Sequence, residues 1–222
     1  KEGGGRVLVG ERVGEGWRLL GIFTRTDLYR RRPAPEAPVG QRVLEALPEG
    51  ARQVVLALKE AFPQGVYLVG GAVRDALLGR SGPDLDLLLE PGVRVEEVAR
   101  HLVARFGGSY ALHYAFGTGR VRLPFGLTVD LAESREEVYP YPGALPRVRP
   151  APIPKDLERR DYTVNAMALS LATLELLDPH GGLSDLRARL LRPLHPLSFV
   201  EDPSRIVRGA RLAARLAFRF AE

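Results

Sequence analysis

Cysteine is absent from the 222-residue chain, which excludes disulfide bonds, thiol catalysis and thiolate metal sites. The sequence also lacks a run of roughly 18 apolar residues and a signal-peptide pattern, so we predict a cytoplasmic protein that does not bind membranes. It begins with Lys1 instead of methionine, which predicts a fragment. With 45% hydrophobic and 27% charged residues, the composition is that of a globular protein with one domain plus appendages, or two small domains.

Lysine is scarce. Three of the 32 basic residues are lysines, so 29 are arginines, and the formal net charge is +5. The planar guanidinium fork matches phosphates and base edges, which favours a polyanionic partner. Genome composition or growth at high temperature would explain the same bias. The positions of the arginines therefore have to decide between the two explanations.

Changes in composition along the chain predict its organisation. Residues 1–32 alternate as two strands would, followed by a helix start capped by Thr26 or Asp27. A linker is predicted at 33–44, where prolines stiffen a charged segment. Apolar spacing in 42–62 indicates a short helix before a longer one, and the alternation of strands and helices up to about residue 195 predicts an α/β domain.

A glycine pair, Gly70 and Gly71, joins a β-rich run to a helical run. Glycines let a ligand approach the bare main chain, and the helix that follows directs its unpaired N–H groups towards the same point. Arg74 lies one turn into that helix, so the segment indicates a phosphate-binding corner. A tight turn that binds nothing is the more common meaning of such a pair.

Acidic residues alternate along the next predicted strand. Asp84 and Asp86 project from one face, and Leu85 and Leu87 from the other. Asp130 lies on a later strand with the same alternation. Carboxylate oxygens are the ligands that Mg²⁺ prefers, and three of them on neighbouring strands can hold two metal ions for nucleotidyl transfer. A solvated turn after residues 82–83 is the alternative for the first pair.

Several segments carry a family resemblance, and they occur in the family's order. They are 68–79 (LVGGAVRDALLG), 84–87 (DLDL), 116–118 (FGT), 135–139 (REEVY), 159–168 (RRDYTVNAMA), 178–186 (DPHGGLSDL) and 201–208 (EDPSRIVR). Together they resemble the motifs of class II tRNA nucleotidyltransferases, the CCA-adding enzymes and bacterial poly(A) polymerases of the polymerase-β superfamily. Tyr162 and Val164 stand where the family usually has Phe and Ile.

The resemblance implies an α/β (α+β) fold. Residues 45–195 would form a polymerase-β-like nucleotidyltransferase head with a mixed sheet and flanking helices, and 196–222 the start of an all-α neck that reads the nucleobase. Residues 1–32, through the string at 21–28, resemble half of a CBS repeat, which some members carry ahead of the head. An additional strand and helix left by truncation is the simpler explanation of that segment.

The resemblance also implies roles for individual residues. Asp84, Asp86 and Asp130 would be catalytic and hold Mg²⁺ in a two-metal site. The nucleotide-binding residues would be Gly70, Gly71 and Arg74 at the triphosphate, Arg159, Asp161 and Asn165 at the nucleotide and ribose, Asp202 and Arg205 at the base, and Arg208 and Arg211 beside them. From spacing alone, Asp161 and Asn165 are expected to share one face of a helix, with Val164 and Met167 packing inward. A charged helix start capped by Asp161 is the alternative for residues 159–161.

Residues 203–222 are expected to form one amphipathic helix. Five arginines on it would fall within an arc of about 120°, at Arg205, Arg208, Arg211, Arg215 and Arg219. This stripe favours the polyanionic partner, although Arg215 and Arg219 are equally well explained by solvation. The residues expected to pack are Ile206, Val207, Ala210, Leu216 and Phe220.

The function implied is a metal-dependent nucleotidyltransferase that adds C and/or A to the tRNA 3′ terminus from CTP and ATP, releasing pyrophosphate. CC-only addition, A-only addition and poly(A) polymerase activity remain open within the family. A non-catalytic regulatory module, in which the CBS segment binds adenine nucleotides and the arginine-rich helix binds RNA, is the alternative from another class. The sequence predicts no oligomeric state.

Overall fold

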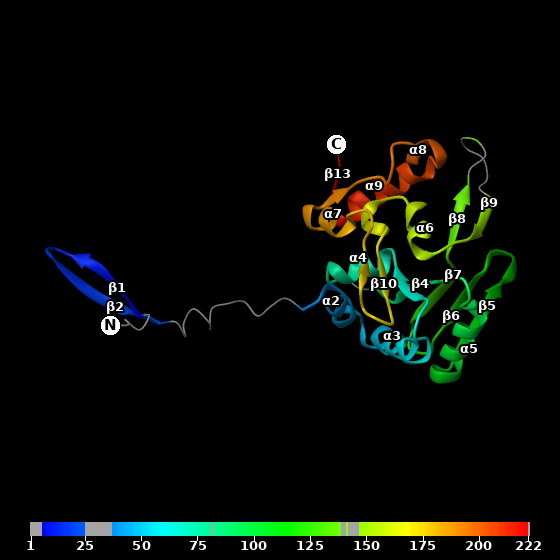
Figure 1. Ribbon diagram of the computed structural model, residues 1–222, viewed down its shortest axis with the longest axis horizontal. Helices are drawn as coiled ribbons and strands as arrows, with labels where there is room; N and C mark the ends of the chain where they lie inside the picture. Colours follow the sequence, from blue (N-terminus) through cyan, green and yellow to red (C-terminus); the bar gives the residue numbers. More distant parts are fainter. Residues whose placement is uncertain (1–5, 25–36, 81, 139–140, 142–146, 222) are drawn as a thin grey trace. The chain divides into compact units, whose positions relative to one another are not determined.

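The computed structural model describes residues 6–24, 37–80, 82–138, 141 and 147–221. The chain divides into two units, residues 1–38 and 39–222 (Figure 1). In the first unit, strands β1 (Arg6–Val13) and β2 (Gly16–Thr24) form an antiparallel hairpin. The two predicted strands are therefore present, whereas the predicted helix start at Thr26 or Asp27 lies outside the described residues.

The second unit begins with two helices, α2 (Val39–Ala46) and α3 (Glu49–Ala61). The short helix followed by a longer one is confirmed. Helix α2 begins inside the segment predicted as a linker, because Val43 and Leu44 are buried in the core and extend the apolar pattern towards Pro38. No described helix is both long and apolar enough to cross a membrane.

A mixed seven-stranded sheet forms the centre of this unit, as the fold prediction expected. The strand order is β11-β10-β3-β4-β7-β6-β5. Strands β4 and β7 are parallel and the other neighbours are antiparallel. The strands are β3 (Val66–Val69), β4 (Asp84–Leu89), β5 (Ser109–His113), β6 (Thr118–Arg122), β7 (Thr128–Glu133), β10 (Ala168–Ser170) and β11 (Leu176–Leu177).

Helices lie on both faces of the sheet but cover them unequally. On one face, side chains of α3 and α5 (Val95–Phe106) join Leu85, Leu87 and Val129 in the main core. On the other face, Ile153 and Leu157 of α6 (Ile153–Glu158) pack over β3, β4 and β10. The part of this second face over β5, β6 and β7 borders a cavity of about 760 Å³.

The remaining elements frame the sheet. They are α4 (Gly71–Leu77), the 3₁₀ turns η1 (Tyr114–Phe116) and η2 (Thr163–Asn165), the hairpin β8 (Arg135–Val138) and β9 (Arg147–Pro150), α7 (Gly182–Ala188), β12 (Leu190–Leu191), α8 (Ser198–Glu201), α9 (Ser204–Leu216) and β13 (Arg219–Phe220). Strand β13 pairs in parallel with β12. The last elements of the chain therefore lie against the domain that carries the sheet (Figure 1).

The prediction of one helix over 203–222 is wrong at its end. Helix α9 stops at Leu216, and Ala217 adopts a left-handed conformation with φ of 55°. This turn buries Phe218 in the core and lets Arg219 pair with β12. Burial and strand pairing thus outweigh the helical pattern, and Arg219 does not belong to the arginine stripe.

The packing face of α9 also differs from the prediction. Ile206 and Val207 are 53% and 65% exposed, and Ala210 and Phe220 are exposed too, so only Leu216 of the predicted set is buried. The buried residues of the helix are Arg205, Gly209, Leu212 and Leu216. The close approach of the main chain at Gly209 selects this face, because a Cβ there would lie 1.9 Å from Oη of the buried Tyr162.

This contact gives a stability prediction. We expect Gly209→Ala to lower the free energy of unfolding by about 1–3 kcal/mol, because the added methyl group would overpack the contact with Tyr162. Chemical denaturation measures the loss. Ala210→Leu adds more volume at an exposed position of the same helix and should stay within about 0.5 kcal/mol of the wild type. Equal stability of Gly209→Ala and the wild type would show that α9 does not pack on Tyr162 in this way.

Candidate active site

Strands β4 and β7 place three aspartates on one face of the sheet. Asp86 lies in register with Asp130, and Asp84 with Thr128. Both β4 aspartates are exposed, while Leu85 and Leu87 are buried beneath them. The predicted alternation along β4 and β7 is therefore confirmed, and the strand pairing sets the spacing of the acids.

Asp130 already has a partner. The Arg120 guanidinium, in register with it on β6, donates from Nε at 2.6 Å to Oδ1 and from Nη2 at 3.0 Å to Oδ2. In the described part of the chain, no group of three acidic or histidine side chains is arranged to hold a metal ion. The exposed oxygens of Asp84 and Asp86 fit a divalent cation that keeps several waters or phosphate ligands. Asp130, as it stands, does not fit as a third ligand.

The pKa of Asp86 depends on its burial and on the charged side chains around it. Crowding by surrounding atoms removes water from the Asp86 carboxylate and raises its pKa, and the charges of Asp130 and Asp84 raise it further. Arg160 and Arg74 act in the opposite direction. Repulsion of this kind is what a bound cation would relieve.

Arg120 also belongs to this acidic site. The hydrogen bonds and charge of Asp130 raise the pKa of its guanidinium, and the charges of Asp84 and Asp86 add to the effect. Arg120, Asp86 and Asp130 line the cavity of about 760 Å³ over the sheet. Arg120 was not a predicted site residue.

The glycine corner lies next to these acids at the end of β3. Gly70 has φ of 61°, and a Cβ there would lie 2.8 Å from Nη1 of Arg160. Any other residue would therefore have a strained backbone at this position and would crowd the Arg160 guanidinium. Arg74 is 4% exposed and donates from Nε and Nη2 to the Asp75 carboxylate and from Nη1 to Asn165. Its guanidinium thus holds other side chains of the site in place.

A second cavity, of about 360 Å³, opens at this corner. It is lined by Gly70, Gly71, Arg74, Arg159, Arg160, Asp161, Asn165 and Arg208. Seven of these eight residues are predicted nucleotide-binding residues, so the fold brings most of that set together. Arg160 is the exception. Arg159 and Arg160 both line the cavity over the acids as well, so these two neighbouring arginines connect the two halves of the site. Arg211 is exposed on α9 and is not among the described residues that line this cavity.

Asp161 and Asn165 meet, although not on one face of an α-helix as predicted. The backbone forms the 3₁₀ turn η2 after Tyr162 instead, because Tyr162 and Val164 are both fully buried. Asn165 Nδ2 donates to Asp161 Oδ1 at 2.9 Å. Val164 and Met167 pack inward as predicted. The alternative, in which residues 159–161 start a helix capped by Asp161, is wrong. These residues follow the end of α6 at Glu158, and Tyr162 is the residue that directly precedes η2.

A buried carboxylate, Asp156, anchors the two arginines beside it in space. It is fully buried and accepts bonds from Arg159 Nε and Nη2 at 3.0 and 2.8 Å and from Arg160 Nη2 at 3.2 Å. It also accepts from the main-chain N–H of Arg135 at the start of β8. Arg159 makes a further bond to Glu137 at 3.0 Å. Asp156 precedes Arg159 and Arg160 by three and four residues, and this helical spacing is the signal that could have identified it from the sequence.

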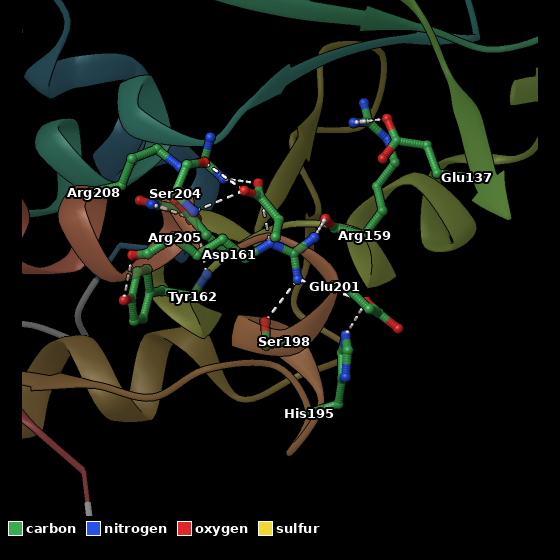
Figure 2. A network of polar contacts seen from close by, with 12 residues as sticks. Glu137, Arg159, Asp161, Tyr162, His195, Ser198, Glu201, Ser204, Arg205 and Arg208 are labelled. Carbon is green, nitrogen blue, oxygen red and sulfur yellow. Dashed lines mark hydrogen bonds and ion pairs between the residues drawn. The ribbon is translucent and has the colours of Figure 1, made fainter. Parts of the chain in front are cut away.

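Arg205 and Arg208 lie differently although both come from α9 (Figure 2). Arg205 is 2% exposed and donates to Ser198 Oγ and to the carbonyl oxygen of Arg159, both at 2.7 Å. It lines a separate cavity of about 550 Å³. Arg208 is exposed and bridges Asp161, at 3.4 Å, and Asp202, at 2.9 Å. Burial alone would raise the pKa of Asp202, but hydrogen bonds from Ser204 and the nearby Arg208 lower it overall.

The mixed sheet, with paired carboxylates beside a glycine corner, defines the class of polymerase-β-like nucleotidyltransferase heads. The family model described as "Poly A polymerase head domain" matches residues 66–192. The chain belongs to this family.

Relatives of two specificities are similar to the chain. A CC-adding tRNA nucleotidyltransferase from Deinococcus radiodurans is 49% identical over 154 residues, which cover 67% of this chain and 40% of the relative. An A-adding tRNA nucleotidyltransferase from Geobacter sulfurreducens is 37% identical over 235 aligned positions, which cover 93% of this chain and 26% of the relative. The chain thus spans well under half the length of these proteins.

Solved structures share the fold. The apo form II structure of a CCA-adding enzyme superimposes with a TM-score of 0.73 at 36% identity, covering 84% of this chain and 45% of that one. A complex of a CCA-adding enzyme with CTP gives a TM-score of 0.70 at 33% identity, covering 84% and 44%.

Proposed function

We propose that the chain is the catalytic head of a metal-dependent tRNA nucleotidyltransferase. In this proposal it adds C and/or A to the 3′ terminus of tRNA from CTP and ATP, and pyrophosphate leaves. The relatives support the reaction class, because they are named as CC-adding and A-adding tRNA nucleotidyltransferases. The related complex with CTP supports the nucleotide substrate.

One observation carries the proposal. Asp84 and Asp86 project from β4 beside the corner at Gly70 and Gly71, and Arg160 lines the cavities on both sides. Nucleotidyl transfer needs this juxtaposition, since the polyphosphate has to be held while the reacting phosphorus lies next to the acids.

Different residues of the site would contact different parts of the nucleotide. The main chain at Gly70 and Gly71, with Arg160 and Arg208, would hold the polyphosphate, because glycine allows close approach and guanidinium groups pair with phosphate oxygens. Asp161 and Asn165, held together at 2.9 Å, would orient the ribose. Base reading by Asp202 and Arg205 stays a prediction, as does the role of Arg211.

Asp84 and Asp86 would hold Mg²⁺, and Asp130 would join them if Arg120 releases it. Bound Mg²⁺ would neutralise the charge that develops on the phosphates and the attacking 3′-hydroxyl. The chain's own contribution is alignment, and no general base is required of its side chains.

Calorimetry tests the proposal directly. We expect CTP to bind about tenfold or more tightly with Mg²⁺ than with EDTA, because the cation would link the triphosphate to the acids. Binding of AMP alone, without a metal effect, would instead support the regulatory module and contradict the enzyme.

We also propose that residues 1–32 are part of a CBS-like segment, on the resemblance of residues 21–28 to half of a CBS repeat. The alignment with the Geobacter relative covers 93% of the chain and therefore extends beyond the head.

The choice between CCA, CC, A and poly(A) addition requires RNA substrates. tRNAs that end before the first C, after CC and after CCA, incubated with CTP or ATP alone, separate the four activities by which end grows. Cytoplasmic localisation stays a prediction.

A further inference from the structure

The ion pair between Arg120 and Asp130 has a geometry unlike an ordinary surface contact. The two residues are directly opposite each other on neighbouring strands, and both carboxylate oxygens accept from the same guanidinium, at 2.6 and 3.0 Å. Such a two-bond arrangement orients the carboxylate as well as neutralising it. Both oxygens that Asp130 could offer to a cation therefore point at Arg120.

The guanidinium borders the same cavity as Asp86 and Asp130. The charges of Asp84 and Asp86 also raise the pKa of Arg120. Arg120 is therefore one of several positive side chains beside three carboxylates that repel one another, and it is hydrogen-bonded to one of them. A divalent cation would bring its charge to this position and compete for the same oxygens.

The Arg120 side chain is exposed enough to move away from Asp130. Its side chain is 53% exposed and that of Asp130 is 39% exposed, so exchange of partners requires no rearrangement of the core. Arg122, two residues further along the same face of β6, lies in register with Thr128 instead of an acid. The strand thus supplies a matched arginine that carries the same charge without the carboxylate partner.

We propose that Arg120 is a positioning residue that competes with the divalent cation for Asp130, and so sets the affinity of the acidic site for the metal. The inference rests on the proposed function, because it takes the aspartates to be the cation ligands. In the structure Arg120 holds both carboxylate oxygens of Asp130. Release of that carboxylate would allow Asp130 to join Asp84 and Asp86 as a ligand of a divalent cation.

The test is a titration of the chain with Mn²⁺, with free Mn²⁺ followed by electron paramagnetic resonance. We expect Arg120→Gln to lower the Mn²⁺ dissociation constant about 3- to 10-fold, the effect expected when an exposed pair that opposes binding is removed. Arg120→Lys keeps the charge but cannot make two parallel bonds, so it should also bind Mn²⁺ more tightly than the wild type. Arg122→Gln should stay within about twofold, because Arg122 lies opposite Thr128 and not opposite a carboxylate that would bind the cation.

Other outcomes would overturn the proposal in different ways. Equal tightening by Arg120→Gln and Arg122→Gln, or a wild-type affinity in Arg120→Lys, would show a general charge effect without competition for Asp130. Adding Asp130→Asn to Arg120→Gln should reverse the gain, and an unchanged affinity would exclude Asp130 as a ligand. If none of these proteins binds Mn²⁺, the assignment of the acids as cation ligands fails, and with it the proposed function.

Discussion

Replacing Asp84 and Asp86 together by asparagine should reduce nucleotide incorporation about 10³-fold or more. Asparagine keeps the shape of both side chains but removes the charges that would hold the cation, and stabilisation by a metal is worth several kcal/mol, at about 1.4 kcal/mol for each factor of ten. Incorporation of labelled CTP into tRNA measures the loss. Binding of CTP in EDTA should stay within about twofold, because the glycine corner and its arginines are unchanged.

The same variant should remain folded. The pKa of Asp86 is raised in the native state, so above the ordinary pKa of an aspartate its charged form is less favourable in the folded chain than in the unfolded chain. Removing that charge should leave the melting temperature unchanged or raise it. Glu60→Gln, at an exposed position of α3, is the matched control and should retain activity. Turnover above a tenth of the wild-type rate in the double variant would contradict the catalytic role of the pair.

Loss of the Asp156 charge should have the largest effect on stability. Asp156→Asn would leave Arg159 and Arg160, whose side chains are 23% and 19% exposed, without the carboxylate that both contact. Breaking a buried pair from one side typically costs about 3–5 kcal/mol. Urea denaturation should show a loss of this size, and CTP binding should weaken because both arginines line the cavity at the glycine corner, where we propose that the nucleotide binds.

A neighbouring acid provides the control for this experiment. Glu158 lies on the same helix, and Lys155 Nζ lies 2.9 Å from its carboxylate, with both side chains about half exposed. Glu158→Gln should therefore cost less than about 1 kcal/mol. If the two variants lose similar stability, Asp156 does not hold the arginines in the way the structure indicates.

The position of the acids could be predicted because a strand offers few alternatives. Once residues 84–89 are a strand, Asp84 and Asp86 must share a face opposite Leu85 and Leu87, and the structure confirms this. The partner of Asp130 depends on the pairing of β6 with β7, which the strand pattern alone does not reveal. A turn recognised at 123–127 would have placed Arg120 opposite Asp130, since Arg122 pairs with Thr128.

The C-terminal elements were harder to predict for a different reason. No glycine or proline interrupts 204–222 except Gly209, which lies inside α9, and the helix ends because Phe218 is buried and Arg219 pairs with β12. Such tertiary contacts leave no periodic signal. The same applies to Arg205, where a residue predicted to read the base is buried against Ser198.

The proposed phosphate corner includes the main chain at Gly70 and Gly71, whereas the side chains near the predicted base position come from α8 and α9. Main-chain groups remain when side chains are substituted, so substitutions in α8 and α9 would alter the choice of base and leave this part of the proposed phosphate site in place. We therefore expect descendants of one ancestral head to diverge in nucleotide preference more readily than in reaction type. The similarity of this chain to both CC-adding and A-adding proteins agrees with such a history.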